Sequence, residues 1–129
     1  MDFLVPEACS ADFSQCTKEE AISRMVDSLV EVGAIPAEVG EDAAELVLKR
    51  EQVGTTGIGR GFAVPHAKHP DLKRVVGCIA RSSHGIDFDS LDGEPVHLLI
   101  LLLSPADQFD AHMRALERTS TWLLGQPLP

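Results

Sequence analysis

The sequence has no hydrophobic run long enough to cross a bilayer. Its longest apolar stretch, residues 96–103, has the length of a strand and is interrupted by His97, whereas a spanning helix needs about 20 apolar residues. The N-terminus, MDFLVPEACS, lacks the basic start and the long apolar segment of a signal peptide. We therefore expect a cytoplasmic protein with no membrane insertion.

Cysteine and positive charge are also scarce. The three cysteines, Cys9, Cys16 and Cys78, form no Cys-x-x-Cys pair, and no pair of ligand residues has the spacing of a zinc site. We expect reduced thiols, with Cys78 buried in a strand. The 20 acidic and 11 basic residues give a net charge of −9. That balance argues against a nucleic acid partner, because phosphate backbones attract positively charged surfaces.

What the sequence does contain is typical of a single globular domain. Its 129 residues are 44% apolar and 24% charged, which suits one sizeable hydrophobic core. The chain has no internal repeat, low-complexity segment or linker, so we expect no division into smaller units.

Capping signals and hydrophobic periodicity predict three helices. Thr17 and Glu20 form a capping box, and apolar residues then recur at helical spacing as far as Gly33. We expect a second helix over about residues 37–51 and a third over about residues 106–124. In the third helix, the side chains expected to face the core are Phe109, Met113, Leu116 and Leu123.

The strands are expected between the second and third helices. Residues 62–64 and 74–82 have the composition of strands, and residues 86–90 alternate like a short one. Residues 96–103 are apolar on both faces, which predicts a central strand covered on both sides. A weak signal for an edge strand lies in residues 7–16. We expect turns at SSHG and LDGEP.

This order of elements predicts an α/β fold of the α+β type. Because helices stand at both ends and strands cluster between them, the helices must pack on the sheet. We expect a mixed β-sheet of about four to five strands, sandwiched between helices as a three-layer α/β/α structure.

A glycine-rich loop, containing Gly57, Gly59 and Gly61, follows the second predicted helix. A dinucleotide-binding loop needs a strand before it and a helix after it, and here that order is reversed. No Gly-Lys-Ser/Thr sequence follows either. We therefore expect the glycines to allow a tight turn and the close approach of another chain segment.

His66 directly follows Pro65 at the expected end of a short strand. Proline cannot donate a ladder hydrogen bond, so we expect the strand to end there and to leave His66 at a defined place on the rim. Imidazole, with an ordinary pKa of about 6.5, is largely neutral at cellular pH and can act as a nucleophile. Position alone does not distinguish a catalyst from a metal ligand or a polar loop residue.

Two further residues favour a catalytic role for His66. Arg50 ends the second predicted helix, and His112 lies near the start of the third. If the fold brings them to His66, two imidazoles and a guanidinium would suit a phosphoryl group in transfer. Basic residues that bracket the histidine segment make its neighbourhood locally positive: Arg60, Lys68, Lys73, Arg74 and Arg81.

The segment KREQVGTTGIGRGFAVPHAKHP resembles the active-site segment of enzyme IIA domains of the bacterial phosphoenolpyruvate-dependent phosphotransferase system. The resemblance is to the fructose/mannitol and nitrogen-regulatory class. It is carried by Arg50-Glu51, Thr56-Gly57 and residues 63–67. A later stretch, LDGEPVHLLILLLSPADQFDAHMRALERTS, resembles the block that bears the family's second histidine, here His112.

The resemblance covers nearly the whole chain, so we expect residues 1–129 to form a single enzyme IIA type-2 domain. The family continues with more helix where this chain stops at LLGQPLP, and we therefore expect a shortened C-terminus. The family fold, a mixed sheet sandwiched by helices, agrees with the elements predicted above.

The resemblance also implies a function. His66 would accept a phosphoryl group from the phosphocarrier protein HPr or its nitrogen-branch counterpart, and Arg50 and His112 would assist the transfer. The group would pass to a IIB domain, or it would act as a regulatory signal towards a target protein. No metal or diffusible cofactor is implied. A stand-alone domain suits the nitrogen-regulatory branch.

Two other interpretations stay open at this point. A non-catalytic regulatory module of the same fold would act by binding a partner or an anion. A metal-dependent hydrolase would use His66, His69 and His112, although no metal motif is present. We expect His69 to lie near the partner surface, and His84 and His97 to be structural.

Overall fold

Two helices on one side of the sheet follow the predicted signals. In the computed structural model, which describes residues 2–9 and 12–127, α1 (Lys18–Glu31) begins at the predicted capping box. The Thr17 hydroxyl accepts a hydrogen bond from the Glu20 N–H at 3.1 Å, and the Glu20 carboxylate accepts one from the Thr17 N–H at 2.9 Å. α2 (Ala37–Val53) starts where predicted and continues past the predicted end.

The described residues form a mixed five-stranded sheet. Its central strand, β5 (Val96–Pro105), pairs parallel with β2 and β3 along one edge and antiparallel with β4 along the other. β1 pairs antiparallel with β2. The other strands are β1 (Gly57–Gly59), β2 (Phe62–Ala63), β3 (His66–His69) and β4 (Val76–Ile86). The buried run at residues 99–103 confirms the prediction of a central strand covered on both sides.

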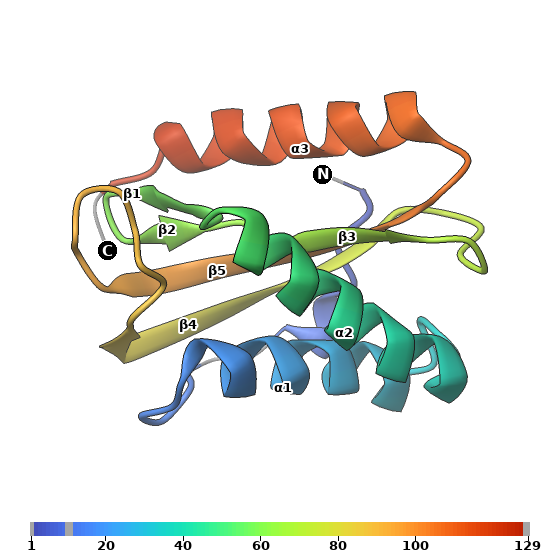
Figure 1. The fold of residues 1–129 in the computed structure, drawn as a ribbon, viewed down its shortest axis with the longest axis horizontal. Helices are drawn as coiled ribbons and strands as arrows, with labels where there is room; N and C mark the ends of the chain where they lie inside the picture. The colour runs from blue at the N-terminus through green and yellow to red at the C-terminus, as the bar shows by residue number, and fades with distance from the viewer. Residues whose placement is uncertain (1, 10–11, 128–129) are drawn as a thin grey trace.

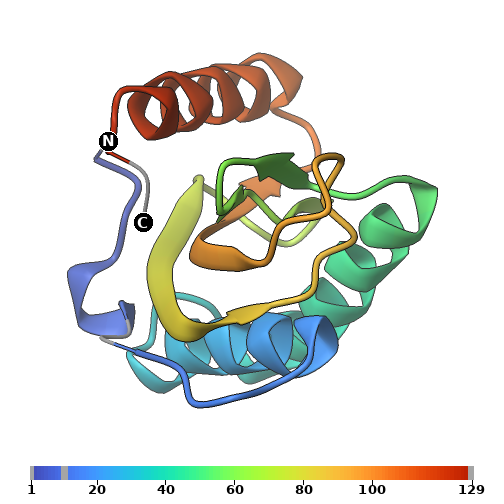
Figure 2. The ribbon, with the colours of Figure 1, turned by 90° about the vertical axis from the view of Figure 1, so that its left-hand side faces the viewer.

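The helices cover both faces of this sheet. Figure 1 shows α3 (Phe109–Leu124) above the strands and α1 and α2 below them, and the turned view in Figure 2 shows the same three layers. The predicted three-layer α/β/α architecture is therefore confirmed. Within the described ranges, no helix has both the length and the apolar character needed to cross a membrane.

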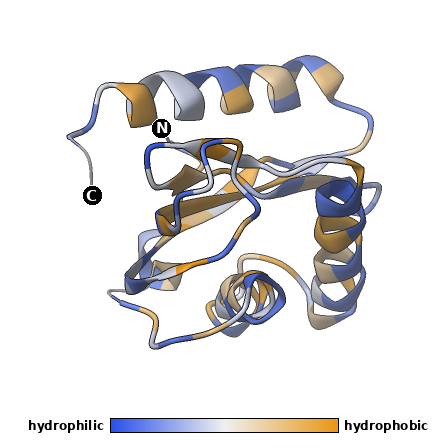
Figure 3. Ribbon diagram, turned by 60° about the vertical axis from the view of Figure 1, so that its left-hand side comes forward, coloured by the Kyte–Doolittle hydropathy of each residue, from blue (hydrophilic) through white to orange (hydrophobic). Residues whose placement is uncertain are grey.

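The hydrophobic core is divided by the sheet into two unequal parts. A large cluster fills the space between the sheet and the α1–α2 layer, with Leu29, Val47 and Leu101 among its fully buried members. A smaller cluster lies under α3 and contains Phe62, Ile100 and Leu123. Figure 3 shows hydrophobic residues concentrated in the strands between the helical layers.

The N-terminal segment does not form the predicted edge strand. Its described residues make one short 3-10 helix, η1 (Pro6–Ala8), and an isolated bridge between Leu4 and Gly77. The Phe13 N–H donates to the carbonyl of Arg81 at 2.7 Å, so the segment follows β4 without regular pairing. Ser10 and Ala11, within that prediction, lie outside the described residues.

β4 is longer than predicted, and two predictions for this region, a turn and a short strand, are wrong. The SSHG stretch, predicted as a turn, lies inside this strand, and residues 87–90, predicted as strand, lie beyond its end. The pairing of β4 with β5 shifts register between Arg81 and Ile86, and Gly85 there adopts a φ of +83°. The turn-forming residues therefore accommodate an irregularity within the strand instead of ending it.

Candidate active site

His66 is the first residue of β3, and its backbone is held within the sheet. β2 and β3 pair with β5 at the same register offset, so residues 62–69 follow one edge of β5 with a break at Val64 and Pro65. β2 ends before Pro65, as predicted, but pairing with β5 resumes at His66, which was not predicted. Proline lacks only the N–H, and its carbonyl still accepts from the Leu102 N–H at 3.0 Å.

The ring of His66 is oriented by the backbone next to it. Its Nδ1 lies 2.8 Å from the carbonyl oxygen of Val64. A carbonyl can only accept a hydrogen bond, so Nδ1 carries the proton, and Nε2 of the neutral ring has a free lone pair. Burial lowers the pKa of His66, and the positive charges of Arg50 and Lys68 act in the same direction. The half-buried ring is therefore neutral near pH 7, with the lone pair of Nε2 free.

His112, from the first part of α3, lies against His66. The two ring centroids are 5.5 Å apart and the ring planes are inclined by 50°. His112 is buried, and its Nδ1 lies 2.7 Å from the hydroxyl oxygen of Ser104. Burial lowers the pKa of His112 to about 4, and the charges of His66 and Lys68 contribute to the shift. This ring is neutral near pH 7 as well.

Arg50 completes the group of three predicted residues. It stands in the last turn of α2, and its Nη1 donates to the carbonyl of Gly54 at 2.8 Å. All three line one hollow of about 490 Å³, which we call the histidine pocket. It is lined by Leu46, Lys49, Arg50, Val53, His66, Ala67, Lys68, Phe109, His112, Met113 and Leu116.

The basic residues at this pocket are only in part the ones that were predicted. Lys49, Arg50 and Lys68 line it, whereas Arg74, expected in the same neighbourhood, lines a different pocket. Arg60 lies in the turn between β1 and β2, where its N–H donates to Asp92 at 2.9 Å. The α2 and β3 residues thus supply positive charge beside both histidines.

Apolar side chains form an exposed rim around the histidine pocket. Val53 is 86% exposed, Phe109 59% and Met113 46%. The prediction that Phe109 and Met113 face the core is wrong, because this side of α3 faces the pocket opening while Ala115 and Leu123 of the same helix meet the sheet. The Lys68 ammonium lies 5.3 Å from the Phe109 ring centroid, a cation–π contact at the rim.

A buried carboxylate in α2 holds the glycine-rich loop that follows this helix. Glu51 accepts from the Lys18 ammonium at 3.0 Å and from the N–H and hydroxyl of Thr56. Gly57 packs so closely that a Cβ there would lie 2.2 Å from the Ser90 hydroxyl. The loop joins a helix to a strand, as the reversed order of elements predicted, and its glycines allow this close approach.

The other histidines lie elsewhere. Successive side chains of a strand point to opposite faces, so His69, three residues after His66, turns towards α2, where its Nε2 lies 3.3 Å from Asp42. It is buried, which corrects its expected place near the partner surface. His97 bonds the carbonyl of Ser82 at 2.7 Å, and His84 is exposed on β4. Among the described residues, no three His, Cys, Asp or Glu side chains are grouped to hold a metal ion.

Ser104 contacts His112 in the candidate site, and the sequence prediction missed this contact. It occupies the position after the apolar run of β5, and its side chain is completely buried. A hydroxyl that interrupts the buried face of a central strand needs a hydrogen-bond partner. That interruption was the available signal: it indicates a polar contact with the layer that covers the strand, but it does not identify His112 as the partner.

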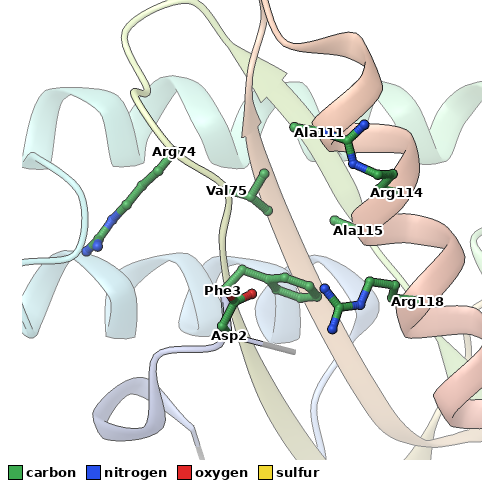
Figure 4. Close-up of a pocket in the computed structure, with 8 residues that line it drawn as sticks. All are labelled: Asp2, Phe3, Arg74, Val75, Ala111, Arg114, Ala115 and Arg118. Atoms are coloured by element: carbon green, nitrogen blue, oxygen red, sulfur yellow. The ribbon is translucent and has the colours of Figure 1, made fainter.

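A second pocket, the arginine pocket, lies on another side of α3 and has a volume of about 380 Å³. In Figure 4 the guanidinium group of Arg118 points towards Phe3 of the N-terminal segment, whereas Arg74 extends away from it. Asp2 and Phe3 also line this pocket, together with Val75, Ala111 and Ala115. None of the predicted catalytic residues lines it, so the histidine pocket is the candidate active site.

Comparison with known sequences shows which family the chain resembles. The family described as "Phosphoenolpyruvate-dependent sugar phosphotransferase system, EIIA 2" matches residues 3–127. A nitrogen regulatory protein of Bradyrhizobium diazoefficiens is 35% identical over 127 residues, which cover 98% of this chain and 81% of the relative. A fructose-specific EIIA component of Haloferax volcanii is 37% identical over 119 residues, which cover 92% of this chain and 75% of the relative.

Solved structures show the same fold. The nitrogen regulatory protein IIA-Ntr from Neisseria meningitidis superposes with a TM-score of 0.81 at 27% identity, covering 91% of this chain and 78% of the other. The mannitol IIA enzyme of Escherichia coli, in a complex with phosphorylated mannitol IIB, gives a TM-score of 0.74 at 22% identity over the same shares of the two chains. These likenesses agree with the mixed sheet and its flanking helices.

Proposed function

Because this chain belongs to the enzyme IIA family of the phosphoenolpyruvate-dependent sugar phosphotransferase system, we propose that His66 is its phosphoryl-accepting residue. The donor is the phosphocarrier protein HPr or its nitrogen-branch counterpart. The observation that carries the proposal is the pairing of two neutral imidazoles, 5.5 Å apart, beside Arg50 in one pocket. The transferred phosphoryl group is the only non-protein group required, and the exchange takes place in the cytoplasm.

The transfer needs no further reactant. The lone pair of His66 Nε2 attacks the phosphorus, a new N–P bond forms, and the donor's N–P bond breaks with its electron pair returning to the donor's imidazole. His66 keeps its Nδ1 proton, and the Val64 carbonyl stabilises the positive charge that the ring acquires. A phosphoimidazole in this protonated form transfers its phosphoryl group readily to the next acceptor.

His112 and Arg50 stabilise the phosphoryl group during transfer. A neutral His112 ring donates one hydrogen bond to an equatorial oxygen, and the guanidinium of Arg50 provides a fixed positive charge. Most of the catalysis of phosphoryl transfer comes from such positioning and electrostatic stabilisation. Lys68, on the same face of β3 as His66, adds positive charge at the pocket.

The surroundings of His66 support a protein as donor and as acceptor. Val53, Phe109 and Met113 form an exposed apolar rim around a locally positive centre, and exposed apolar patches with polar surroundings mark protein contacts. We propose a IIB domain or a regulatory target protein as acceptor. The E. coli mannitol IIA enzyme was solved bound to phosphorylated IIB, and the relatives named nitrogen regulatory proteins favour the regulatory role.

The test is phosphorylation with purified components. Incubation with phosphoenolpyruvate, enzyme I and HPr is expected to add one acid-labile phosphate to the wild-type chain, and His66→Ala is expected to lose it completely. His112→Ala should keep the fold and slow the transfer. His84→Ala, which removes an exposed histidine from β4, is the matched control and should be labelled like the wild type.

Two outcomes would contradict the proposal. Labelling that persists in His66→Ala would mean that another residue is the acceptor. A wild-type chain that binds its partners but takes up no phosphate from either carrier would instead support the non-catalytic regulatory module.

A further inference from the structure

Ser104 and His112 form a buried polar pair under α3. Their side chains are bonded at 2.7 Å between Oγ and Nδ1, with Ser104 completely buried and His112 4% exposed. Side chains alternate along β5, so Ser104 shares the α3-facing side of the sheet with Ile100 and Leu102. A serine hydroxyl on this apolar face is costly unless it is hydrogen-bonded, and His112 is the partner that the structure provides.

The two histidines of the pocket have opposite hydrogen-bonding environments. His66 Nδ1 faces a carbonyl oxygen, which fixes its proton on Nδ1. His112 Nδ1 faces a hydroxyl, which can donate. If Ser104 donates, the single proton of a neutral His112 stands on Nε2. One ring then offers an unprotonated Nε2 as nucleophile, and the other offers a protonated Nε2 as donor.

We propose that Ser104 is a positioning residue for the transfer reaction: its hydroxyl donates to His112 Nδ1 and holds the neutral ring in the tautomer whose Nε2–H donates to the phosphoryl group. This inference rests on the function proposed above for His66 and His112. Ser104 does not touch the phosphoryl group itself. It acts through the ring, because the group bonded to one imidazole nitrogen decides which nitrogen carries the proton.

Two features make Ser104 suited to this task. It lies in the central strand, where its backbone pairs with β3 opposite Lys68, so the hydroxyl is fixed relative to the strand that carries His66. The low pKa of His112 keeps that ring neutral near pH 7, so a single proton is shared between its two nitrogens and the choice of tautomer matters. A protonated ring would donate from both nitrogens whatever Ser104 did.

The experiment measures the tautomer and the transfer rate separately. Two-bond 15N–1H correlation spectra of the unphosphorylated protein identify the protonated ring nitrogen of His112 without any partner protein. The variants are Ser104→Ala, which removes the hydroxyl, and Ser104→Thr, which retains it. Ser82→Ala is the matched control, because Ser82 is also a buried strand serine and its hydroxyl bonds the Gly85 N–H at 3.1 Å, in β4.

We expect wild type, Ser104→Thr and Ser82→Ala to show His112 protonated at Nε2, and Ser104→Ala to show a mixture of the two tautomers. With phosphorylated HPr as donor, Ser104→Ala should lower kcat about tenfold with little change in KM. Ser104→Thr should restore the rate. Thermal melting of each variant verifies that it is folded before the rates are compared.

Three results would overturn the inference. They are a wild-type His112 protonated at Nδ1, an unchanged tautomer in Ser104→Ala, and a lower kcat that Ser104→Thr does not restore. If the wild type accepts no phosphate, the function proposed for His66 is contradicted instead. The spectra would still show whether Ser104 determines which nitrogen of His112 carries the proton.

Discussion

The two faces of the sheet bury different kinds of side chain. The face covered by α1 and α2 holds the larger cluster, which is continuous from Ala21 in α1 to Leu103 in β5. The face covered by α3 holds a smaller apolar cluster and, beside it, the bonded pair Ser104 and His112. We infer that most of the free energy of folding comes from burial on the face covered by α1 and α2. The face covered by α3 buries a polar pair because that pair belongs to the candidate site.

Truncation of buried leucines should reveal the largest difference in stability between the two faces of the sheet. Leu29→Ala, in α1, removes a fully buried side chain from the larger cluster and should lower the free energy of unfolding by about 3–5 kcal/mol. Leu123→Ala, in α3, is equally buried but belongs to the smaller cluster, and should lower it by about 2–3 kcal/mol. Urea unfolding measures both. Equal losses would contradict the assignment of stability to one face.

Acid should destabilise the protein through the α3 face. The pKa of His112 is about 4 in the fold and 6.5 ordinarily, so between these pH values the unfolded chain binds a proton that the folded chain excludes. The free energy of unfolding should therefore fall by up to about 3 kcal/mol as the pH drops from 6.5 to 4. His112→Gln should flatten this slope in urea titrations at several pH values.

His84→Gln, at an exposed position on β4, is the control for that titration and should retain the wild-type slope. A slope that is the same in His112→Gln as in the wild type would show that the acid sensitivity comes from another part of the molecule.

Substitution of two buried serines by alanine should give the smallest changes in the free energy of unfolding, and these changes should have opposite signs. Within the described residues, the Ser90 hydroxyl has no hydrogen-bond partner, whereas the Ser104 hydroxyl is bonded to His112. Ser90→Ala should therefore raise the free energy of unfolding by up to about 1 kcal/mol, and Ser104→Ala should lower it by a similar amount. Thermal melts would measure both changes, and a loss of stability in Ser90→Ala would mean that its hydroxyl is satisfied in solution.

Local signals in the sequence predicted most of the elements, and together with the family resemblance they predicted which residues would meet in one pocket. The first helix and the central strand were predicted correctly, because their sequence patterns are each compatible with one structure. These patterns are the capping box at Thr17 and Glu20 and the run of β5 that is apolar on both faces. Arg50, His66 and His112 meet in one pocket. Their convergence needed the resemblance to a family as well as residue chemistry, because they stand far apart in the chain.

The incorrect predictions arose where one sequence pattern is compatible with two different structures. Helical periodicity shows that Phe109 and Met113 share a stripe, but it does not distinguish a stripe against the core from a stripe around an open pocket. Gly85 and its neighbours have turn composition, yet they bend β4 without ending it. Proline at position 65 interrupts a strand, and only tertiary pairing with β5 decides that the strand resumes at His66.

The way β3 is anchored separates the nitrogen proposed to accept the phosphoryl group from the surface proposed to contact other proteins. His66 is placed by main-chain pairing with β5 and by a main-chain carbonyl, whereas the rim consists of exposed side chains such as Val53, Phe109 and Met113. If the rim binds partners as proposed, substitutions there should change which partner is recognised, while the geometry of the His66 ring stays constant. A new partner specificity can therefore be selected or engineered here without rebuilding the chemistry.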